Sequence, residues 1–522
     1  MKKRGIKDLK KVSCSPLSPG YFVNEPYGDR RVLKVPCYEL GTGTSHLYGR
    51  PITGVFAVVD VEEKRVLDVV DLGVVALPPQ PDPARVPRAA LKPVQMTSSQ
   101  GRNYKIKGAI QIEWDNWSFH MRMERRTGPV ISLVRYNDRG KKRLIAYQMS
   151  LSEMFVPYMD PGADWSYRTF MDSGEFGAGF LMSSLMAGSD CPADAAYVTM
   201  AVPNDTGRSF PVRRAACIFE RNTGDPLWRH GNPAQPTNLT RPQVELVVRM
   251  IPVLGNTDYI IDWVFTHQGD INVRVALAGI AAVKGVTSAT MNNPFAGAET
   301  ANGTLVAPGT VVPLHDHFFN FRLDLDVDGG GSGAGNSLIR DSIVPKRLPQ
   351  SNPRRSLWVV DSKTITSEGP LAARGHNGTW RVVNPNRKTA LGHNPGFEIV
   401  TGNQSVSTLA EDDDPQRRAG FAARTLWLTR QNPRELFAAG DYPTQARGGG
   451  GLPQYVADSQ NVVNKDLVVW LTVGIHHIPR VEDWPVMPTE WYGFKLRPFN
   501  FFDENPAFNI PAGFATTTSE VP

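Results

Sequence analysis

Residues 313–329 read PLHDHFFNFRLDLDVDG, and apolar and polar side chains alternate along most of this stretch. Successive side chains of a β-strand point to opposite faces, so residues two apart share a face. One face then carries His315, His317, Phe319, Phe321, Leu323 and Leu325, and the other carries Asp316, Arg322, Asp324, Asp326 and Asp328. The stretch therefore predicts a strand whose apolar face also presents two histidines.

Similar strand-like runs follow one another from about residue 100 onward. Examples are IKGAIQIEW (106–114), QVELVVRMI (243–251) and DLVVWLTVGIHH (466–477). Helical periodicity is scarce, and the chain contains 47 glycines and 42 prolines, as loop-rich β proteins do. Many strands at short spacing predict sheets that pack face to face. We therefore expect a mainly β fold built on a large antiparallel β-sandwich.

The region before residue 100 predicts a smaller unit. GVFAVVDVEEKRVLDVV (54–70) contains two strand-like runs around a turn. The proline-rich stretch PPQPDPARVPRAALKP (78–93) is typical of a connector between domains. We predict a small α/β domain over residues 1–88, a linker over 89–99 and the β-sandwich over 100–522.

Composition excludes several classes of protein. Charged residues make up 21% of the chain and hydrophobic residues 41%, as in ordinary globular proteins. The net charge of +6 is small for 522 residues, and no basic patch is interleaved with aromatic residues, so we expect no nucleic-acid partner. The chain has no run of 18 apolar residues, and its basic start, MKKRGIKDLKK, is not followed by an apolar segment. We expect no membrane span and no secretory signal, which favours a cytoplasmic protein.

The four cysteines form no C-x-x-C pair, so we expect no cysteine zinc site. Counting alone would leave all four as reduced thiols; they are Cys14, Cys37, Cys191 and Cys217.

Two histidine clusters suggest a metal centre. His315 and His317 share one strand face, and imidazole suits copper, zinc or iron. The segment that contains His476 and His477 could supply a third ligand from either residue. The alternative is that His315 and His317 are hydrogen-bonded residues of the core.

The acidic residues that follow the histidines allow two interpretations. Asp324, Asp326 and Asp328 alternate with apolar residues. They could lie on a solvated outer strand face. Carboxylate oxygens are also the ligands that calcium or a similar hard cation prefers.

Several long motifs together resemble those of the copper amine oxidases, and the match covers nearly the whole chain. They include segments similar to the family's small domain, the entry to its catalytic β-sandwich, the loop of its catalytic base, its copper strand and its third copper ligand. In chain order these are YGRPITGVFAVVD (48–60), WDNWSFHMRMERRTGPVISLVRY (114–136), EMFVPYMDP (153–161), FMDSGEFG (170–177), HDHFFNFRLDLDVDG (315–329) and GIHHIPRVEDWPVMP (474–488).

The resemblance implies a role for each matching residue. Copper would be bound by His315, His317 and His477. Asp172 would be the base that takes a proton from the substrate carbon, Tyr158 would hydrogen-bond the cofactor oxygen, and Asn256 would orient the cofactor ring. A peripheral calcium-like ion would be held by Asp324, the Leu325 carbonyl, Asp326, Asp466 and the Leu467 carbonyl.

The resemblance also implies a disulfide between Cys191 and Cys217 and an interlocked homodimer. A disulfide argues against the cytoplasmic location expected above. The chain departs from the family pattern at three places. We expect the family's usual domains before the small unit to be absent or vestigial. Residues 219–222 read FERN where the family has a HEED-like stretch, and Phe170 stands at a gate position that is often tyrosine.

The most consequential departure lies in VLGNTDYIIDW (253–263). In the family, the residue after the asparagine is a tyrosine that bound copper and dioxygen convert to topaquinone, the cofactor that oxidises primary amines to aldehydes. This chain has Thr257 there, and threonine has no ring to oxidise, so we do not expect topaquinone. Tyr259 could replace the precursor only through a register slip that would misdirect Asn256 and Asp258.

Three functions remain open on this basis. The first is a quinone-less copper oxidoreductase, whose small phenolic or amine substrate would occupy the space beside Thr257. Copper would then act on this substrate directly, either with dioxygen or as a Lewis acid. The second is conventional primary-amine oxidation, and the third is an inactive relative that binds copper.

Overall fold

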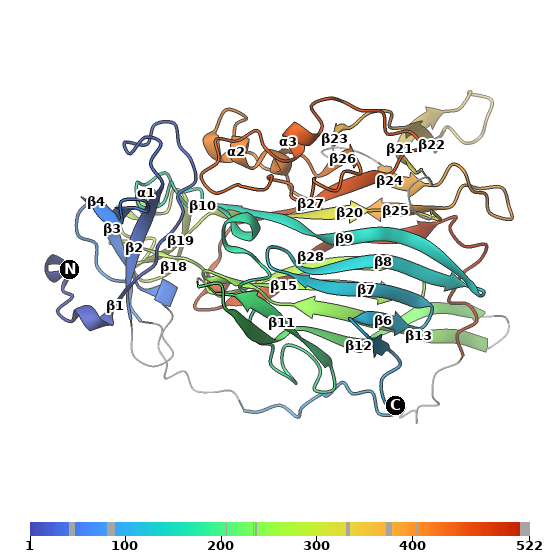
Figure 1. Ribbon diagram of the computed structural model, residues 1–522, viewed down its shortest axis with the longest axis horizontal. Helices are drawn as coiled ribbons and strands as arrows, with labels where there is room; N and C mark the ends of the chain where they lie inside the picture. The colour runs from blue at the N-terminus through green and yellow to red at the C-terminus, as the bar shows by residue number, and fades with distance from the viewer. Residues whose placement is uncertain are drawn as a thin grey trace.

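The computed structural model describes residues 1–511 except 41–46, 81–88, 205, 233, 235–236, 330–334, 372–377 and 403. Two large antiparallel sheets stack on each other, and a small sheet formed by the N-terminal residues lies at one end of the stack (Figure 1). The expected domain boundary at residue 88 lies outside the described residues, as do residues 512–522.

The first large sheet contains both histidine segments. In spatial order its described strands are β23 (Gly369–Leu371), β26 (Leu426–Arg430), β27 (Leu467–His477), β20 (His315–Asp324), β9 (Lys141–Pro157), β8 (Gly128–Asp138), β7 (Trp117–Glu124), β6 (Gln111–Trp114) and β5 (Lys105–Lys107), with β10 (Thr169–Met171) paired to β9. β20 is therefore a central strand, which explains why all of its residues are buried.

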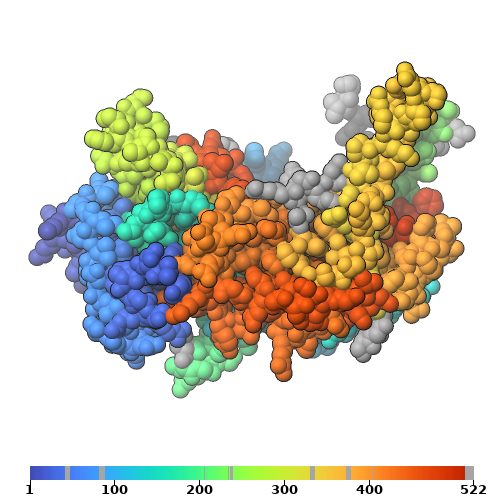
Figure 2. All heavy atoms as spheres, turned by 90° about the horizontal axis from the view of Figure 1, so that it is seen from above, coloured from blue at the N-terminus to red at the C-terminus, as the bar shows by residue number. Residues whose placement is uncertain are grey.

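The second large sheet contains the segment with Thr257. In spatial order its described strands are β11 (Ala196–Pro203), β12 (Ser209–Asn232), β13 (Thr237–Met250), β15 (Thr257–Thr266), β16 (Ile271–Gly279), β28 (Met487–Phe499), β25 (Gly396–Val400), β24 (Gly378–Val383), β21 (Ser337–Arg347) and β22 (Ser356–Thr364), with β14 (Val253–Leu254) paired to β15. The β21–β22 hairpin, gold in Figure 2, projects from one corner of the molecule.

The apolar faces of the two sheets form the main core. Phe119 of β7 stacks on Phe265 of β15, with ring centroids 4.3 Å apart. Trp263 of β15 meets Phe321 of β20 edge to face at 5.8 Å. Contacts of this kind fix the sheets relative to each other, because packed interiors leave little room for sliding. They therefore hold β15, which begins at Thr257, over β20, which begins at His315.

Smaller elements complete the fold. The N-terminal sheet contains β1 (Val12–Cys14), β2 (Val32–Glu39), β3 (Pro51–Asp60) and β4 (Arg65–Asp71), and a further small sheet contains β17 (Lys284–Gly285), β19 (Thr310–Pro313) and β18 (Gly303–Ala307). The α-helices of the described chain are short: α1 (Ala296–Glu299), α2 (Asp414–Arg418) and α3 (Leu452–Tyr455). Within the described residues up to 80, helix is limited to three 3-10 turns, Lys2–Arg4, Leu9–Lys11 and Leu47–Gly49.

The predicted β-sandwich is confirmed. Phe319, Phe321 and Leu323 lie in the main core, as the alternation predicts. The opposite face of this strand is not solvated, because Asp324 is 1% exposed and Asp326 is 6% exposed. No helix among the described residues is both long and apolar enough to cross a membrane.

Two disulfides replace the four thiols that counting suggested. Cys191 is bonded to Cys217, as the family resemblance implied. Cys14 is bonded to Cys37, a pair that the sequence did not predict. These two residues face each other on β1 and β2. Strand register brings them together, and register is a property of the folded sheet.

Candidate active site

Three histidines converge at the start of β20 and the end of β27. The antiparallel register places His315 directly opposite His477 and Asp316 directly opposite His476. His317 lies two residues further along β20, on the same face as His315. Their nitrogen ligand atoms lie within 4.8 Å of one another. The sheet therefore brings together His315, His317 and His477, the residues that the family resemblance implied.

The hydrogen bonds of these histidines leave one nitrogen of each ring for a metal. Nδ1 of His315 lies 2.9 Å from the Pro313 oxygen, Nδ1 of His317 lies 3.1 Å from the Tyr259 hydroxyl, and Nε2 of His477 lies 3.1 Å from Asp483 Oδ2. Nε2 of His317 is buried and has no hydrogen-bond partner among the described residues. His477 Nδ1 and His315 Nε2 are 3.1 Å apart. Outer partners of this kind orient metal-ligating imidazoles.

The protonation of the cluster also fits a metal. Burial, and then the nearby His477, lowers the pKa of His315 to about 3, and burial holds the pKa of His317 well below its usual range. Both rings are therefore neutral at physiological pH, the form in which imidazole binds metals. The donor set of three imidazoles suits copper.

His476 has a different role from its neighbour. Its Nδ1 lies 2.8 Å from Asp316 Oδ1, on the opposite face of the sheet from the cluster. The two candidates for the third ligand, His476 and His477, are thus separated by the strand pleat.

A tight turn presents Thr257 to the cavity described below. β14 and β15 are paired through Leu254 and Thr257, so Gly255 and Asn256 form a two-residue turn. Gly255 has φ +63, which glycine adopts without strain. The Asn256 amide donates to the Ile280 oxygen at 2.7 Å and to the Thr257 hydroxyl at 3.2 Å. The side chain of residue 257 is therefore held at the end of its hairpin, where it is 3% exposed.

Tyr158 and Tyr259 link the hairpin to the histidines. The Tyr158 ring stacks on the His315 ring, with centroids 4.7 Å apart. The Tyr259 hydroxyl lies 3.1 Å from His317 Nδ1 and 3.3 Å from Asp172 Oδ2. Each tyrosine therefore stands between a histidine and the cavity described below.

Asp172 begins a single π-helical turn, Asp172–Phe176, directly after β10. The turn is anchored on both sides. The Gly174 amide donates to Glu153 Oε1 at 2.8 Å, and Arg418 donates to Glu175 Oε1 at 2.5 Å. π-Helical turns are rare and are often found at functional sites.

The charge of Asp172 is strongly disfavoured in this position. Burial, and then the negative charge of Glu175, raises the pKa of Asp172 to about 8. A carboxyl group with a pKa near neutrality can take and return a proton under physiological conditions.

A cavity of about 340 Å³ joins these groups. Its polar lining includes Tyr158, Asp172, Asn256, Thr257 and Tyr259, so the structure brings together all four residues predicted as catalytic. The walls are largely apolar and include Val156, Phe170, Leu181, Leu254 and Ala282. Such a combination of apolar walls and a few convergent polar groups is typical of small-molecule sites.

Sequence reasoning missed part of this lining. Tyr38 of β2 and Tyr48 of the 3-10 turn Leu47–Gly49 form one wall of the cavity, and Arg168 forms another part of it. A Cβ atom on Gly255 would lie 3.9 Å from the Tyr48 hydroxyl, which shows how closely the two regions approach. No local pattern links these tyrosines to the cavity. Arg168 lies four residues before Asp172, which could have marked it for attention.

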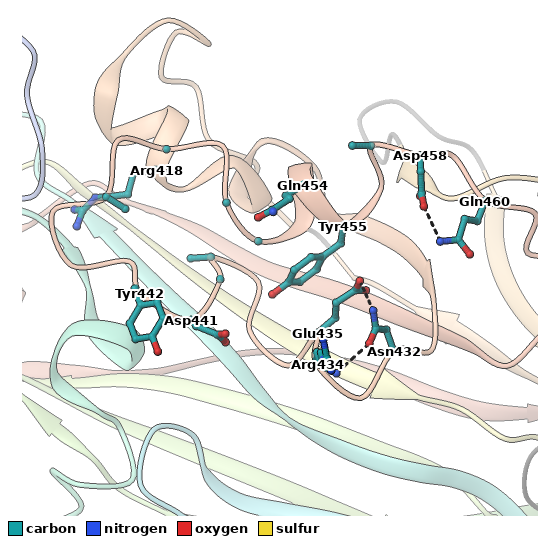
Figure 3. Close-up of a pocket in the computed structure, with 17 residues that line it drawn as sticks. Arg418, Asn432, Arg434, Glu435, Asp441, Tyr442, Gln454, Tyr455, Asp458 and Gln460 are labelled. Atoms are coloured by element: carbon teal, nitrogen blue, oxygen red, sulfur yellow. Dashed lines mark hydrogen bonds between the residues drawn. The ribbon is translucent and has the colours of Figure 1, made fainter.

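A larger hollow, of about 690 Å³, lies elsewhere, between residues 418 and 460 (Figure 3). Its polar groups largely satisfy one another: Asn432 donates to Glu435 at 2.8 Å, and Gln460 donates to Asp458 at 2.7 Å. None of the predicted site residues lines it. Size alone therefore does not mark the functional cavity of this protein.

An acidic cluster lies at the far end of the same two strands. Carboxylate oxygens of Asp324, Asp326 and Asp466 lie within 4.8 Å of one another. Burial, and then neighbouring carboxylates, raises the pKa of Asp326 to about 7, and burial raises that of Asp324 to about 6 although Arg322 opposes the shift. Leu325 follows β20 and Leu467 begins β27, so the backbone of both predicted carbonyl ligands adjoins the cluster.

Comparison with known proteins agrees with this geometry. The sequence profile described as "Copper amine oxidase, enzyme domain" matches residues 105–517, and that described as "Copper amine oxidase, N3 domain" matches residues 1–85. The chain belongs to the copper amine oxidase family. Members of this family are oxidoreductases, and a copper centre is the norm among them.

Relatives match over nearly the whole chain. A "Primary amine oxidase" of Klebsiella aerogenes is 39% identical over 518 residues, which cover 97% of this chain and 68% of that protein. A "Primary amine oxidase" of Pisum sativum is 34% identical over 521 residues, which cover 97% of this chain and 75% of that protein. The crystal structure of a copper-containing benzylamine oxidase from Hansenula polymorpha has a TM-score of 0.88, 27% identity, and coverage of 98% of this chain and 80% of that one.

Proposed function

We propose that this member of the family is a copper-dependent oxidoreductase that acts, with dioxygen, on a small substrate bound beside Thr257, without a quinone made from its own chain. The cavity beside Thr257 carries this proposal. The cavity has a volume of about 340 Å³ and contains the Asp172 carboxyl group, whose pKa is about 8. Two of its lining residues, Tyr158 and Tyr259, contact His315 and His317.

Each group in the cavity has a task in this proposal. Copper held by His315, His317 and His477 would supply redox exchange with dioxygen. Asp172 takes or returns a substrate proton, because its pKa lies near neutrality. Tyr158 and Asn256 orient the substrate, and the apolar walls exclude water.

The proposal has two further parts, a cation site and a partner subunit, which rest on other regions of the structure. A hard cation such as calcium would bind at Asp324, Asp326 and Asp466, where three carboxylates lie close together.

A second copy of the chain is the partner that fits the projecting β21–β22 hairpin, because Trp358 is 63% exposed and Val360 is 52% exposed on it. Light scattering should report a dimer, and Trp358→Glu should weaken it.

Conventional primary-amine oxidation is the second candidate, and the names of the relatives favour it. In this chain it would require a quinone made from Tyr259. The Tyr259 hydroxyl is directed to Nδ1 of His317, whereas Nε2 is the nitrogen of that ring left for copper. Tyr259 thus contacts the nitrogen of His317 that would not hold copper, which favours the quinone-less proposal.

Electron paramagnetic resonance of the copper-loaded protein tests the proposal. Phenol and benzylamine are added to the parent, to Thr257→Val and to Thr257→Tyr. We expect phenol to change the copper signal of the parent and of Thr257→Val, which keeps the space. Thr257→Tyr should bind copper but respond weakly, because the new ring fills the cavity.

A stain for quinones can contradict the quinone-less proposal. Nitroblue tetrazolium detects protein-bound quinones, and we expect no stain with the parent. A stained parent protein that releases peroxide from benzylamine would establish the conventional activity and overturn the proposal. A stain that appears only in Thr257→Tyr would support it.

A further inference from the structure

Arg168 is a buried cation that lines the cavity beside Thr257. It is 6% exposed, and its Nε donates to the Asp164 backbone oxygen at 3.3 Å. Its guanidinium stacks on the Trp165 ring, with 3.8 Å from Cζ to the ring centroid. These contacts hold the stem and one face of the guanidinium and leave its two terminal amino groups without an ion-pair partner among the described residues.

The other buried arginines of the described chain are all paired. Arg143 contacts Asp328 at 2.5 Å, Arg418 contacts Glu175 at 2.5 Å, and Arg322 contacts Asp324 at 3.3 Å. Arg168 is the exception in this group. A buried charge without an ion-pair partner is destabilising, and stacking on an aromatic ring offsets only part of this cost. A ligand with a negative charge would remove the deficit.

The rest of the cavity agrees with an anionic ligand. Asp172 has a pKa of about 8, so it is mostly uncharged at neutral pH and does not neutralise Arg168. The hydroxyl groups of Tyr38, Tyr48 and Tyr158 add neutral hydrogen-bonding partners. Phe170 and Leu181 provide apolar wall for a ring. A cationic amine would meet an unfavourable charge in this cavity.

We propose that the cavity binds a small aromatic carboxylate, with the carboxylate on Arg168 and the ring beside Thr257. The position of the ring rests on the proposed function above. Arginine suits this task because its planar fork matches the two oxygens of a carboxylate. The volume of about 340 Å³ lies within the range of small-molecule sites. Arg168 is thus a specificity-determining residue that selects acids over amines.

Calorimetric titration with a matched pair of probes tests this inference. 4-Hydroxyphenylacetate carries the charge, and 4-hydroxyphenylacetamide has nearly the same shape without it. The parent protein, loaded with copper, should bind the acid about 10-fold to 100-fold more tightly than the amide, as expected for charge-assisted hydrogen bonds in a buried site. The same samples are examined by electron paramagnetic resonance.

Variants assign the preference to Arg168. Arg168→Met should bind the two probes equally, and Arg168→Lys should recover part of the preference. Arg139→Met is the control, because Arg139 is paired with Glu504 on the surface and should keep the full preference. If Arg168→Met does not fold, the probe pair still decides the matter with the parent protein alone.

The outcomes separate this inference from the proposed function. Equal binding of acid and amide by the parent overturns the inference, even where both probes change the copper signal as the proposed function requires. An Arg168-dependent preference without any change of the copper signal supports the anion site and contradicts the proposed function. Binding of neither probe overturns the inference as well.

Discussion

β20 and β27 carry a potential metal site at each end, and the fold holds the two sites in different ways. At one end, His315 and His477 face each other within the strand ladder, and His317 follows on the same face. At the other end, Asp324 ends β20, Asp326 lies beyond it, and Asp466 precedes β27. The histidines are thus fixed by sheet register, whereas two of the three acids lie in the segments that adjoin the strands.

The two ends also differ in charge. His315 and His317 are neutral, and the outer nitrogens of the three histidines contact the Pro313 oxygen, Tyr259 and Asp483. The acids repel one another, and this repulsion adds to burial in raising the pKa of Asp326 to about 7. The histidine end is therefore preorganised without a metal, while the acidic end needs a proton or a cation. Removal of the metal from the histidine end should abolish copper-dependent activity. Removal of the cation from the acidic end should lower the stability of the fold.

The strongest test of this contrast replaces neighbouring histidines. His477→Ala should lower bound copper from about one ion per chain to less than a tenth, because one of three ligands is lost. His476→Ala is the matched control and should keep its copper, because His476 bonds Asp316 on the other face. Elemental analysis of the purified variants measures both. Copper loss in His476→Ala would contradict the ligand assignment.

A smaller loss of copper affinity is expected when Asp483, which contacts the outer nitrogen of His477, is replaced. Asp483→Asn weakens the acceptor that orients His477 and should reduce copper affinity about 10-fold to 100-fold at unchanged stoichiometry. Competition with a copper chelator of known affinity measures this change. An unchanged affinity would mean that the strand ladder alone orients His477.

The acidic end should respond to calcium through stability. Calcium should raise the unfolding temperature of the parent by about 2–5 °C over protein in a calcium chelator, since a ligand that binds only the folded state stabilises it. Asp326→Asn should lose most of this gain and keep its copper. Scanning calorimetry at several calcium concentrations measures the shift. An equal gain in Asp326→Asn would place the cation elsewhere.

The smallest effect concerns pH without metals. The pKa of Asp326 is raised in the folded protein, so the folded state binds the extra proton, and stability falls as pH rises from about 4 to about 7. A rise of about three pKa units corresponds to at most about 4 kcal/mol. The Asp326→Asn variant has no carboxyl group to titrate at this position. Its free energy of unfolding, measured with urea, should therefore depend less on pH. A parent that becomes more stable across this range would contradict the repulsion.

The resemblance and the residue pattern together predicted most of the site, but the final selection came from long-range contacts. Spacing alone left His476 and His477 as equal candidates, and strand pairing brings only His477 to the cluster. Alternation allowed a solvated acidic face, yet Asp324 and Asp326 are buried beneath neighbouring elements. Tyr38 and Tyr48 gave no signal of their own, because the cavity that they line is formed by segments far apart in the chain.

Local residue patterns predicted the β-sandwich, and the H-x-H pair and the missing ring at residue 257 are read directly from the chain. These properties are local: alternation follows from the two-residue period of a strand, and residue type alone sets which atoms a side chain contains. The folded sheets explain why His477 and not His476 joins the cluster, and they reveal that Cys14 pairs with Cys37 and that buried Arg168 has no ion-pair partner among the described residues. Register, burial and pairing depend on residues far apart in the chain, and packing of the sheets brings those residues together.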